Sequence, residues 1–344
     1  MICDPDQEDP QQVSERILTI SVIVPVYNGS ATVGACLESL LGQTYPHGAY
    51  EVIVVENGST DNTSHIVASY PVRLLHSELR GPAAARNLGL ARSQADIIAF
   101  TDADCVADSC WLSELVRSYN DPAVGGAGGP ILAAIQEPAS MVEHFLAENP
   151  PVTNYISGAH EFLPHLGTGN ASYRRGLLEQ VGGFDPRLVT AEDVDLSWRL
   201  HLETGANLSF AENALIYHRP RVTRKGLARQ FRQYGFGEIL LDTLYGHCAG
   251  YPRSRACQLV RMLHQVAALP RYVASGLLRR LRLALGRATP YQAMVPWLAL
   301  LRETSNLHGK CEGLVATRLM TDPRPALSMP AEVLIDRLFQ AKRE

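Results

Sequence analysis

Apolar residues come in short runs along the first part of the chain, and polar segments separate these runs. Residues 18–26 read Leu-Thr-Ile-Ser-Val-Ile-Val-Pro-Val, a β-branched run that is typical of a strand buried on both faces. Shorter runs at 51–55, 72–75 and 96–101 predict three further strands. The segment after the first run has apolar residues on one helical stripe: Val33, Leu37, Leu40 and Leu41. Strands that alternate with helices across short connections predict an α/β fold with a mostly parallel sheet flanked by helices.

Polar side chains follow three of these strands directly. Asn28, Glu56 and Asp102 each lie just past a predicted strand end. Ligands of open α/β sheets bind at the carboxyl ends of the strands, so we expect these residues to converge on one crevice.

The acidic pair Asp102 and Asp104 is the first candidate for chemistry. Alternate residues of an extended segment face the same way, so both carboxylates can point at one site. Carboxylate oxygens suit a hard cation, Mg²⁺ or Mn²⁺, whose other positions are filled by water and a diphosphate. The alternative is an acidic turn in contact with solvent.

A second acidic cluster, Glu192-Asp193-Val194-Asp195, precedes apolar residues at helical spacing. One interpretation is structural: acids stabilise a helix N-terminus, and Asp195 pairs with Arg199 one turn later. The other is catalytic, because a carboxylate beside a bound sugar can accept the proton of an attacking hydroxyl.

Five short motifs occur in order along the chain. They are Val24-Pro25-Val26-Tyr27-Asn28, Val54-Val55-Glu56-Asn57-Gly58-Ser59-Thr60-Asp61, Gly81-Pro82-Ala83-Ala84-Ala85-Arg86-Asn87, Asp102-Ala103-Asp104 and Glu192-Asp193. Together, over about residues 18–220, they resemble the family-two glycosyltransferases of GT-A fold. The resemblance implies inverting transfer of a sugar from a nucleoside-diphosphate sugar to an acceptor hydroxyl, with a divalent cation as cofactor. A carbohydrate or a lipid-linked acceptor fits the synthesis of a polysaccharide, glycolipid or other glycoconjugate.

The resemblance also implies roles for single residues. The donor would contact Pro25, Tyr27, Asn28, Glu56, Arg86 and Asp102. Asp104 would bind the cation, with Asp102 beside it and His218 as a third ligand; a hydrogen-bonded histidine at a strand end is the alternative for His218. Asp193 matches the catalytic base, and Glu192 would support the base or the acceptor. Gly167-Thr168-Gly169-Asn170 resembles the acceptor-side loop, or is an ordinary turn.

Two departures from the family pattern refine the hypothesis. Many relatives have Asp-Asp-Gly-Ser where this chain has Glu56-Asn57-Gly58-Ser59, which leaves the nucleobase open. The Gln-x-x-Arg-Trp element of processive members is absent, since Gln230-Phe231-Arg232-Gln233-Tyr234 does not fit its spacing. This favours transfer of one sugar per encounter.

Two other functions compete with this hypothesis. A sugar-1-phosphate nucleotidyltransferase needs a basic, glycine-rich loop after the first strand, but Tyr27-Asn28-Gly29-Ser30 has no basic residue. A non-catalytic sugar-nucleotide-binding protein would have no use for three acids crowded in one cleft, because like charges repel each other.

Charge is distributed unevenly along the chain. The net charge of −4 does not indicate nucleic-acid binding, yet residues 219–290 hold 14 Lys and Arg against two acids, Glu238 and Asp242. Within this region, 255–288 mixes leucines with arginines. Such a helix either rests on an anionic membrane surface or packs its basic face against the acidic part of the chain.

These patterns predict three segments: a flexible acidic leader at 1–16, a GT-A domain at 17–220 and a basic helical region at 221–344. The leader lacks the basic start and apolar stretch of a secretory signal. No window is long and apolar enough to span a bilayer. Seven cysteines without metal-type spacing fit a reducing compartment. We therefore expect a cytoplasmic protein, peripheral on the inner face of the membrane if the basic helix binds lipid.

Overall fold

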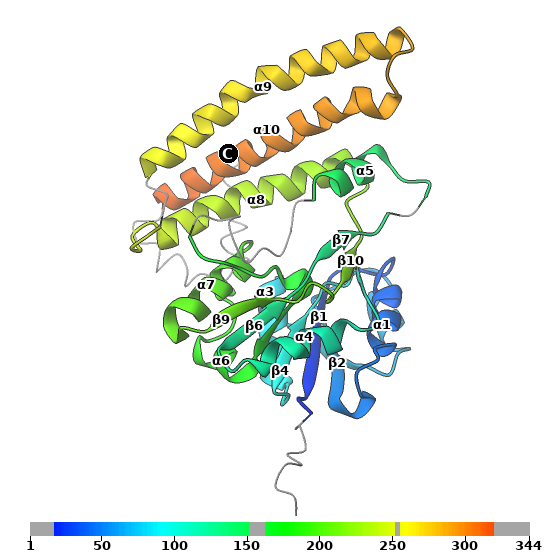
Figure 1. Ribbon diagram of the computed structural model, residues 1–344, viewed down its shortest axis with the longest axis vertical. Helices are drawn as coiled ribbons and strands as arrows, with labels where there is room; N and C mark the ends of the chain where they lie inside the picture. Colours follow the sequence, from blue (N-terminus) through cyan, green and yellow to red (C-terminus); the bar gives the residue numbers. More distant parts are fainter. Residues whose placement is uncertain (1–16, 136, 151–161, 252–254, 320–344) are drawn as a thin grey trace, which may run out of the picture.

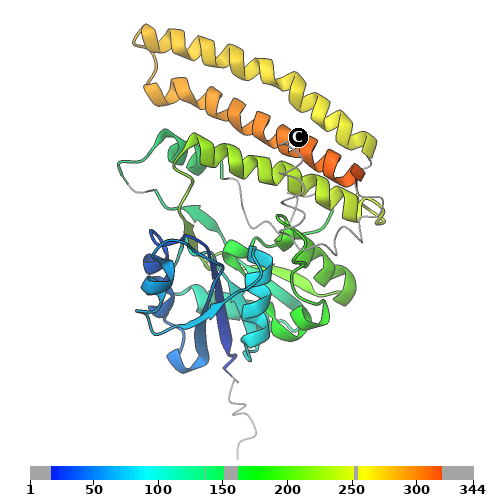
Figure 2. The ribbon, with the colours of Figure 1, turned by 180° about the vertical axis from the view of Figure 1, so that it is seen from behind.

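The computed structural model describes residues 17–135, 137–150, 162–251 and 255–319 (Figure 1). The expected leader, 1–16, and residues 320–344 of the expected helical region lie outside these residues. An α/β part with a central sheet lies at one end of the molecule, and a layer of long helices lies at the other (Figures 1 and 2).

The central sheet has seven strands in the order β3-β2-β1-β4-β8-β6-β9. Its strands are β1 (Ile20–Val26), β2 (Tyr50–Glu56), β3 (Arg73–His76), β4 (Ile97–Phe100), β6 (Val124–Gly128), β8 (Ala171–Arg174) and β9 (Asn207–Phe210). Strands β3, β2, β1 and β4 are parallel, as the alternating pattern predicts, and β8 runs antiparallel to both of its neighbours. The expected mixed, mostly parallel α/β sheet is thus confirmed.

The two faces of the sheet are buried under separate sets of helices. Because side chains alternate along a strand, Val22 and Val24 of β1 belong to one apolar cluster and Ile23 to the other. One face is covered by α1 (Val33–Leu41), α2 (Thr63–Val67) and α4 (Trp111–Arg117), and the other by α3 (Pro82–Arg92), α6 (Arg175–Gln180) and α7 (Glu192–Thr204). Single 3₁₀ turns lie at His47–Ala49, Ser118–Asn120 and Thr168–Asn170.

A small second sheet extends the ligand edge. It consists of β5 (Cys105–Ala107), β10 (Ile216–His218) and β7 (Ile131–Ala133), with β10 in the middle. Its antiparallel register pairs His218 with Cys105, and the Arg219 amide donates a hydrogen bond to the Asp104 carbonyl at 3.0 Å. Two segments more than a hundred residues apart in the sequence are thereby brought together.

The helical region consists of three long helices and the shorter α5 (Met141–Glu148). The long helices are α8 (Arg224–Tyr245), α9 (Arg255–Ala284) and α10 (Pro290–Leu319). Helix α8 lies nearest the sheet, α10 packs on α8, and α9 is outermost (Figures 1 and 2). Among the described helices, none is apolar enough over a sufficient length to cross a membrane.

Glycines let α8 and α10 approach closely. A Cβ atom added at Gly235 would lie 1.9 Å from the Asn306 carbonyl oxygen, and one at Gly309 would lie 1.9 Å from that of Arg232. Each helix thus presents a glycine to the backbone of the other. Ion pairs of Arg232 with Glu312 and of Lys310 with Glu238 flank this contact.

Candidate active site

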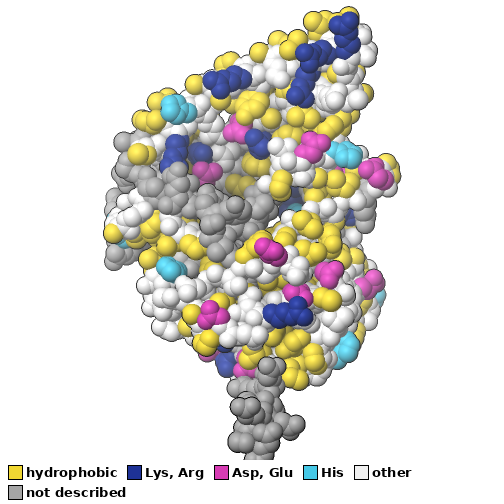
Figure 3. Space-filling model, in the orientation of Figure 1, with side chains coloured by type: hydrophobic (Ala, Val, Ile, Leu, Met, Phe, Trp, Pro, Cys, Tyr) yellow, Lys and Arg dark blue, Asp and Glu magenta, His cyan; other side chains and the backbone are white. Residues whose placement is uncertain are grey.

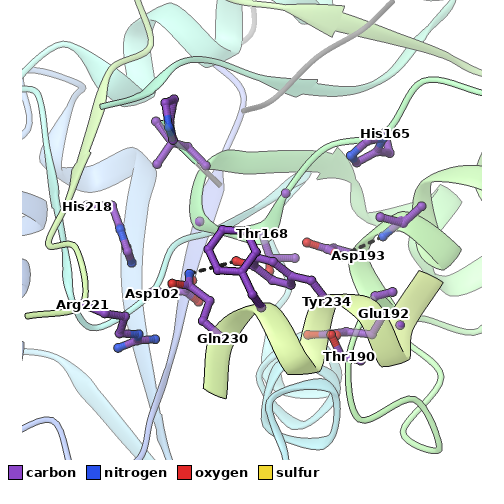
Figure 4. A pocket seen from close by; sticks show the side chains of 18 of the residues that line it. Asp102, His165, Thr168, Thr190, Glu192, Asp193, His218, Arg221, Gln230 and Tyr234 are labelled. Atoms are coloured by element: carbon purple, nitrogen blue, oxygen red, sulfur yellow. Dashed lines mark hydrogen bonds between the residues drawn. The ribbon is translucent and has the colours of Figure 1, made fainter. Parts of the chain in front are cut away.

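A cavity of about 600 Å³ lies between the ligand edge of the sheet, the N-terminus of α7 and helix α8 (Figure 4). The acidic residues on its wall are Asp102, Glu192, Asp193 and Glu238, and Arg86, His218 and Arg221 are also part of the wall. The two acidic motifs, 90 residues apart in the sequence, therefore open into one space.

Arg86 joins the two acidic motifs. Its Nη2 donates to Oδ1 of Asp102 at 2.9 Å, and its Nη1 donates to Oε1 of Glu192 at 2.8 Å. The Arg86 side chain is only 4% exposed, and its guanidinium lies 5.5 Å from the ring centre of Phe184. The family resemblance implies that Arg86 lies near the nucleotide. In the structure its guanidinium is part of the cavity wall and contacts both carboxylates as one rigid fork.

The N-terminus of α7 is held in an unusual backbone conformation. Ala191, directly before Glu192, has a φ of 63°, which non-glycine residues adopt rarely. Gly237 of α8 packs here, since a Cβ added to it would lie 3.0 Å from Cγ2 of Thr190. Helix α8 therefore supports the turn that aims Glu192 and Asp193.

In the second acidic cluster, Asp195 fits the structural interpretation and Asp193 fits the catalytic one. Oδ2 of Asp195 accepts from Nε of Arg199 at 2.8 Å, and its Oδ1 accepts from the Tyr245 hydroxyl at 2.7 Å, so Asp195 has a structural part. Asp193 instead lines the cavity, and one of its oxygens accepts from the Val194 amide.

Burial raises the pKa of Asp193 above its usual value, although the nearby charge of Arg86 acts in the opposite direction. The same two effects act on Glu192, whose pKa is also raised. A carboxylate with a raised pKa is a stronger base than an ordinary aspartate. Asp193 has the position and the basicity of a proton acceptor.

Asp104 lies beside two basic side chains. Its Oδ2 is 3.5 Å from Nε2 of His218 and 3.4 Å from Nη1 of Arg221. Burial alone would raise the pKa of Asp104, but the hydrogen bond and charge of His218, together with the charge of Arg221, hold it below its usual value. Asp104 is thus an anion at neutral pH.

These side chains fit a divalent cation that takes most of its ligands from a diphosphate. Asp104 offers an oxygen and His218 an imidazole nitrogen, a donor set suited to Mn²⁺ or Mg²⁺. In the part of the chain that the structure describes, no three His, Cys, Asp or Glu side chains are grouped so as to hold a metal. Asp102 instead lies against Arg86. The protein would supply a minority of the ligands.

The residues expected to hold the nucleoside lie along the sheet edge, outside the wall of the cavity. Oδ1 of Asn28 accepts from the Thr60 amide at 2.8 Å, which fixes the loops after β1 and β2 to each other. Tyr27 is 56% exposed, and Pro25 lies one residue before the end of β1. The structure brings these residues to the same edge of the sheet as Asp102.

Glu56 is buried at the end of β2. Burial would raise its pKa, but hydrogen bonds from Ser59 and His76 outweigh this effect, so the pKa of Glu56 lies below its usual value. This carboxylate therefore stays charged and can accept further hydrogen bonds.

Helix α8 contributes wall residues that were not expected from the sequence. Nε2 of Gln230 donates to the Tyr234 hydroxyl at 3.0 Å, and both side chains project from α8 at the cavity wall (Figure 4). Oε1 of Gln230 is buried and has no hydrogen-bond partner among the described residues. The only sequence signal was a failed match to the processive motif over these positions.

The acceptor-side loop expected at 167–170 also reaches the cavity. Gly167, Thr168 and Gly169 line it, whereas Asn170 faces away and accepts a hydrogen bond from the Trp111 indole at 2.8 Å. His165 completes this side of the wall, and burial lowers its pKa to about 4. This imidazole is therefore neutral at physiological pH.

The fold and the cavity define a nucleotide-binding α/β protein with an acidic site at the ends of its strands. Comparison with known proteins identifies the family: residues 21–182 match the family model described as "Glycosyl transferase family 2". The glycosyltransferase AglE of Haloferax volcanii is 32% identical over 227 residues, which cover 64% of this chain and 73% of that protein. The pre-mycofactocin glycosyltransferase of Mycobacterium tuberculosis is 31% identical over 61% of this chain and 45% of its own length.

A solved structure shows the same fold. The mannosyltransferase PcManGT from Pyrobaculum calidifontis, in complex with GDP-Man and Mn²⁺, has a TM-score of 0.55 at 22% identity and covers 86% of this chain and 87% of its own. The chain belongs to glycosyltransferase family 2 and is a nucleotide-sugar glycosyltransferase. The nucleotidyltransferase and the non-catalytic binding protein are thereby set aside. This chain spans less than half of the mycobacterial relative.

Proposed function

We propose that the chain transfers one sugar per encounter from a nucleoside-diphosphate sugar to an acceptor hydroxyl, with inversion and with help from a divalent cation. One observation carries the proposal: Asp193 opens into the cavity that Asp102 also lines, and Arg86 holds Asp102 and Glu192 in one arrangement. A base and a donor-side carboxylate thus face a single space large enough for a sugar.

Asp193 acts as the base. It accepts the proton of the acceptor hydroxyl, whose oxygen forms a bond to the anomeric carbon as the bond from that carbon to the β-phosphate oxygen breaks. A single displacement inverts the anomeric centre, and no covalent enzyme intermediate is needed. The hydrogen bond from Arg86 fixes Glu192, and Glu192 in turn helps to hold Asp193, the next residue of the helix, in position.

The leaving diphosphate lies at the other side of the cavity. Asp104 and His218 would hold the cation there, with Asp102 beside it, and when bound the ion stabilises the negative charge of the leaving group. Arg221, which is half-exposed and lies 3.4 Å from Asp104, adds a positive side chain for the phosphate oxygens. PcManGT, which has the same fold, was solved with GDP-Man and Mn²⁺, and this supports the use of a cation but does not bear on its ligands.

The nucleoside lies along the sheet edge. Tyr27 offers an exposed ring for stacking, Pro25 and Asn28 shape the loop, and the charged Glu56 accepts a hydrogen bond from the base or ribose. On the opposite wall, the unpaired Oε1 of Gln230 can accept a hydrogen bond from a sugar hydroxyl. A carbohydrate or lipid-linked acceptor would enter beside Gly167 and Thr168.

A donor screen with one matched pair of variants tests the proposal. With Mn²⁺, release of nucleoside diphosphate from a panel of UDP-, GDP- and dTDP-sugars should select a donor, and a chelator should abolish the release. Asp193→Asn should lower turnover by roughly 10²–10⁴-fold, the typical contribution of a general base, while the Kd for the donor stays unchanged. Glu203→Gln, an exposed carboxylate on the same helix, is the control. Wild-type turnover by the Asp193 variant would refute the assignment of the base.

A further inference from the structure

Helix α9 presents an apolar face to solvent. Seven apolar positions are spaced three or four residues apart, so they share one face of the helix: Leu259, Leu263, Val266, Pro270, Val273, Leu277 and Leu281. Leu263, Leu277 and Leu281 are 57–58% exposed, and Leu278 beside them is 52% exposed. Exposed leucines scattered singly are ordinary, but a continuous stripe of them indicates an interaction surface.

This stripe is not the face that α9 uses inside the protein. Another face of the helix packs on α10: Met262 is buried, Gln265 donates to Oε2 of Glu303 at 2.9 Å, and a Cβ added at Gly276 would lie 2.6 Å from the Trp297 ring. With α10 and α8 between it and the sheet, α9 does not lie on the acidic α/β part (Figure 1). The alternative of a basic helix packed against that part is therefore not what the structure shows.

The charges around the stripe are all positive. From Arg255 to Arg287 the chain has seven arginines and no Asp or Glu. By helical spacing, Arg271 and Arg282 flank the stripe on one side and Arg280 flanks it on the other. Figure 3 shows hydrophobic side chains along the edge of the molecule over α9, with basic side chains beside them.

We propose that this outward face of α9 docks on an anionic lipid bilayer, lying flat with its leucines among the acyl chains and its arginines at the headgroups. An apolar stripe between cationic flanks, without acids, is the pattern of an interfacial helix. Thirty residues give roughly 45 Å of contact length at 1.5 Å per residue. Arginines near an anionic leaflet add attraction that neutral lipid does not provide.

A second copy of the chain fits the face less well. A two-fold contact through α9 would place the same stripe and the same arginines opposite themselves, without any acid on either helix to pair with them. Like charges in an apolar contact are unfavourable, whereas lipid phosphates complement them.

Membrane docking and catalysis are separable in this geometry. Helix α9 touches the cavity wall through Gln265, which donates to Oδ1 of the wall residue Asn306 at 3.2 Å, and none of the leucines of the stripe lines the cavity. Substitutions on the outward face of α9 should therefore leave release of nucleoside diphosphate unchanged in the absence of lipid. Lipid binding can also be measured without any sugar donor, so a failure of this proposal is distinguishable from a failure of the proposed function.

Co-sedimentation of the full chain with lipid vesicles tests the proposal. Wild-type protein should bind vesicles of phosphatidylglycerol and phosphatidylcholine in equal parts, and bind pure phosphatidylcholine about tenfold or more weakly. The triple variant Leu263→Gln, Leu277→Gln and Leu281→Gln should lose about tenfold or more in affinity for the anionic vesicles. Because all three side chains are already more than half exposed, this variant should fold normally.

Three further measurements keep the test sharp. The double variant Arg271→Gln and Arg282→Gln should lose most of the preference for anionic lipid. Leu202→Gln and Val315→Gln, two equally exposed positions outside α9, should bind as the wild type does. The proposal is overturned if the wild type ignores anionic vesicles, if it binds neutral vesicles equally well, or if light scattering shows a dimer that the triple variant converts to a monomer.

Discussion

Arginine has opposite surroundings at the two ends of this molecule. In the α/β part, Arg86 is 4% exposed and shares its guanidinium between Asp102 and Glu192. On α9, Arg271 and Arg282 face solvent, and their helix has no acid. A charge neutralised inside the chain fixes the geometry of a site, whereas charges left without internal partners are available to something outside the protein.

Helix α8 belongs to both regions. Its inner side supplies Gln230 and Tyr234 to the cavity, and its Tyr245 hydroxyl contacts Asp195 of α7. Its outer side packs on α10, with Arg232 paired to Glu312. The expected domain boundary near residue 220 stays a prediction. Helix α8, the first helix after it, forms part of the cavity wall together with residues before the boundary.

Replacing the buried arginine should have the largest effect on stability. Arg86→Met leaves Glu192 buried without its partner, and loss of one member of a buried ion pair typically costs about 3–5 kcal/mol. Urea unfolding monitored by circular dichroism should show a loss of this size. Arg86→Lys keeps the charge but cannot reach both carboxylates as a fork, so its loss should be intermediate.

Arg117→Met supplies the surface counterpart. Arg117 pairs with Glu114 on α4 but is 70% exposed, so its removal should cost less than about 1 kcal/mol. Equal losses at Arg86 and Arg117 would contradict the contrast between internal and external charge.

The ligand edge of the sheet was predictable because its signals are local. The strand runs at 18–26 and 96–101 and the acids just beyond them follow from periodicity 2 and from the rule that ligands bind at the carboxyl ends of strands. Asp102, just past the strand at 96–101, and Asp193, at the N-terminus of α7, both line one cavity, and their roles there stay predictions. The ion pair of Asp195 with Arg199, which belongs to the structural interpretation of the second acidic cluster, also follows from helical spacing.

The contributions of distant segments were not predictable. Nothing near Arg86 in the sequence shows that it pairs with Glu192, because that contact spans 106 residues and depends on how α3 and α7 pack. Gln230 and Tyr234 enter the cavity only because glycines let α8 approach α10 and the turn at Thr190. A single sequence shows where a glycine is, but it does not show which distant backbone segment packs against that glycine.

The glycine contact between α8 and α10 should produce the next largest effect. Gly235→Ala places a methyl group against the Asn306 backbone, which cannot yield as a flexible side chain can, and overpacking of this kind costs about 1–3 kcal/mol. Thermal unfolding should show the loss. At Gly176 of α6 an added Cβ meets no atom within 4 Å, so Gly176→Ala should leave stability unchanged or raise it. A Gly235 variant as stable as wild type would contradict the close approach of the two helices.

The smallest effect concerns the pH at which Asp193 loses its proton. The base must be ionised to accept a proton, and its pKa is raised by burial. The acid limb of the kcat/KM profile should therefore lie at a higher pH than the usual range of an aspartate, with activity falling as the pH falls through it. An acid limb within the usual aspartate range would contradict the burial of the base.

The same shift has a consequence for stability, with a definite sign. A carboxyl whose pKa is higher in the folded than in the unfolded state contributes stability below its unfolded pKa and loses that contribution as the pH rises through its folded pKa. Asp193→Asn removes this dependence, while Glu192, whose pKa is also raised, remains in both proteins. The variant should therefore gain stability relative to the wild type as the pH rises through the folded pKa of Asp193, although it has lost its activity. Urea unfolding at a series of pH values measures the difference in the free energy of unfolding between the variant and the wild type. A difference that stays constant across that series would show that the pKa of Asp193 is not raised by folding.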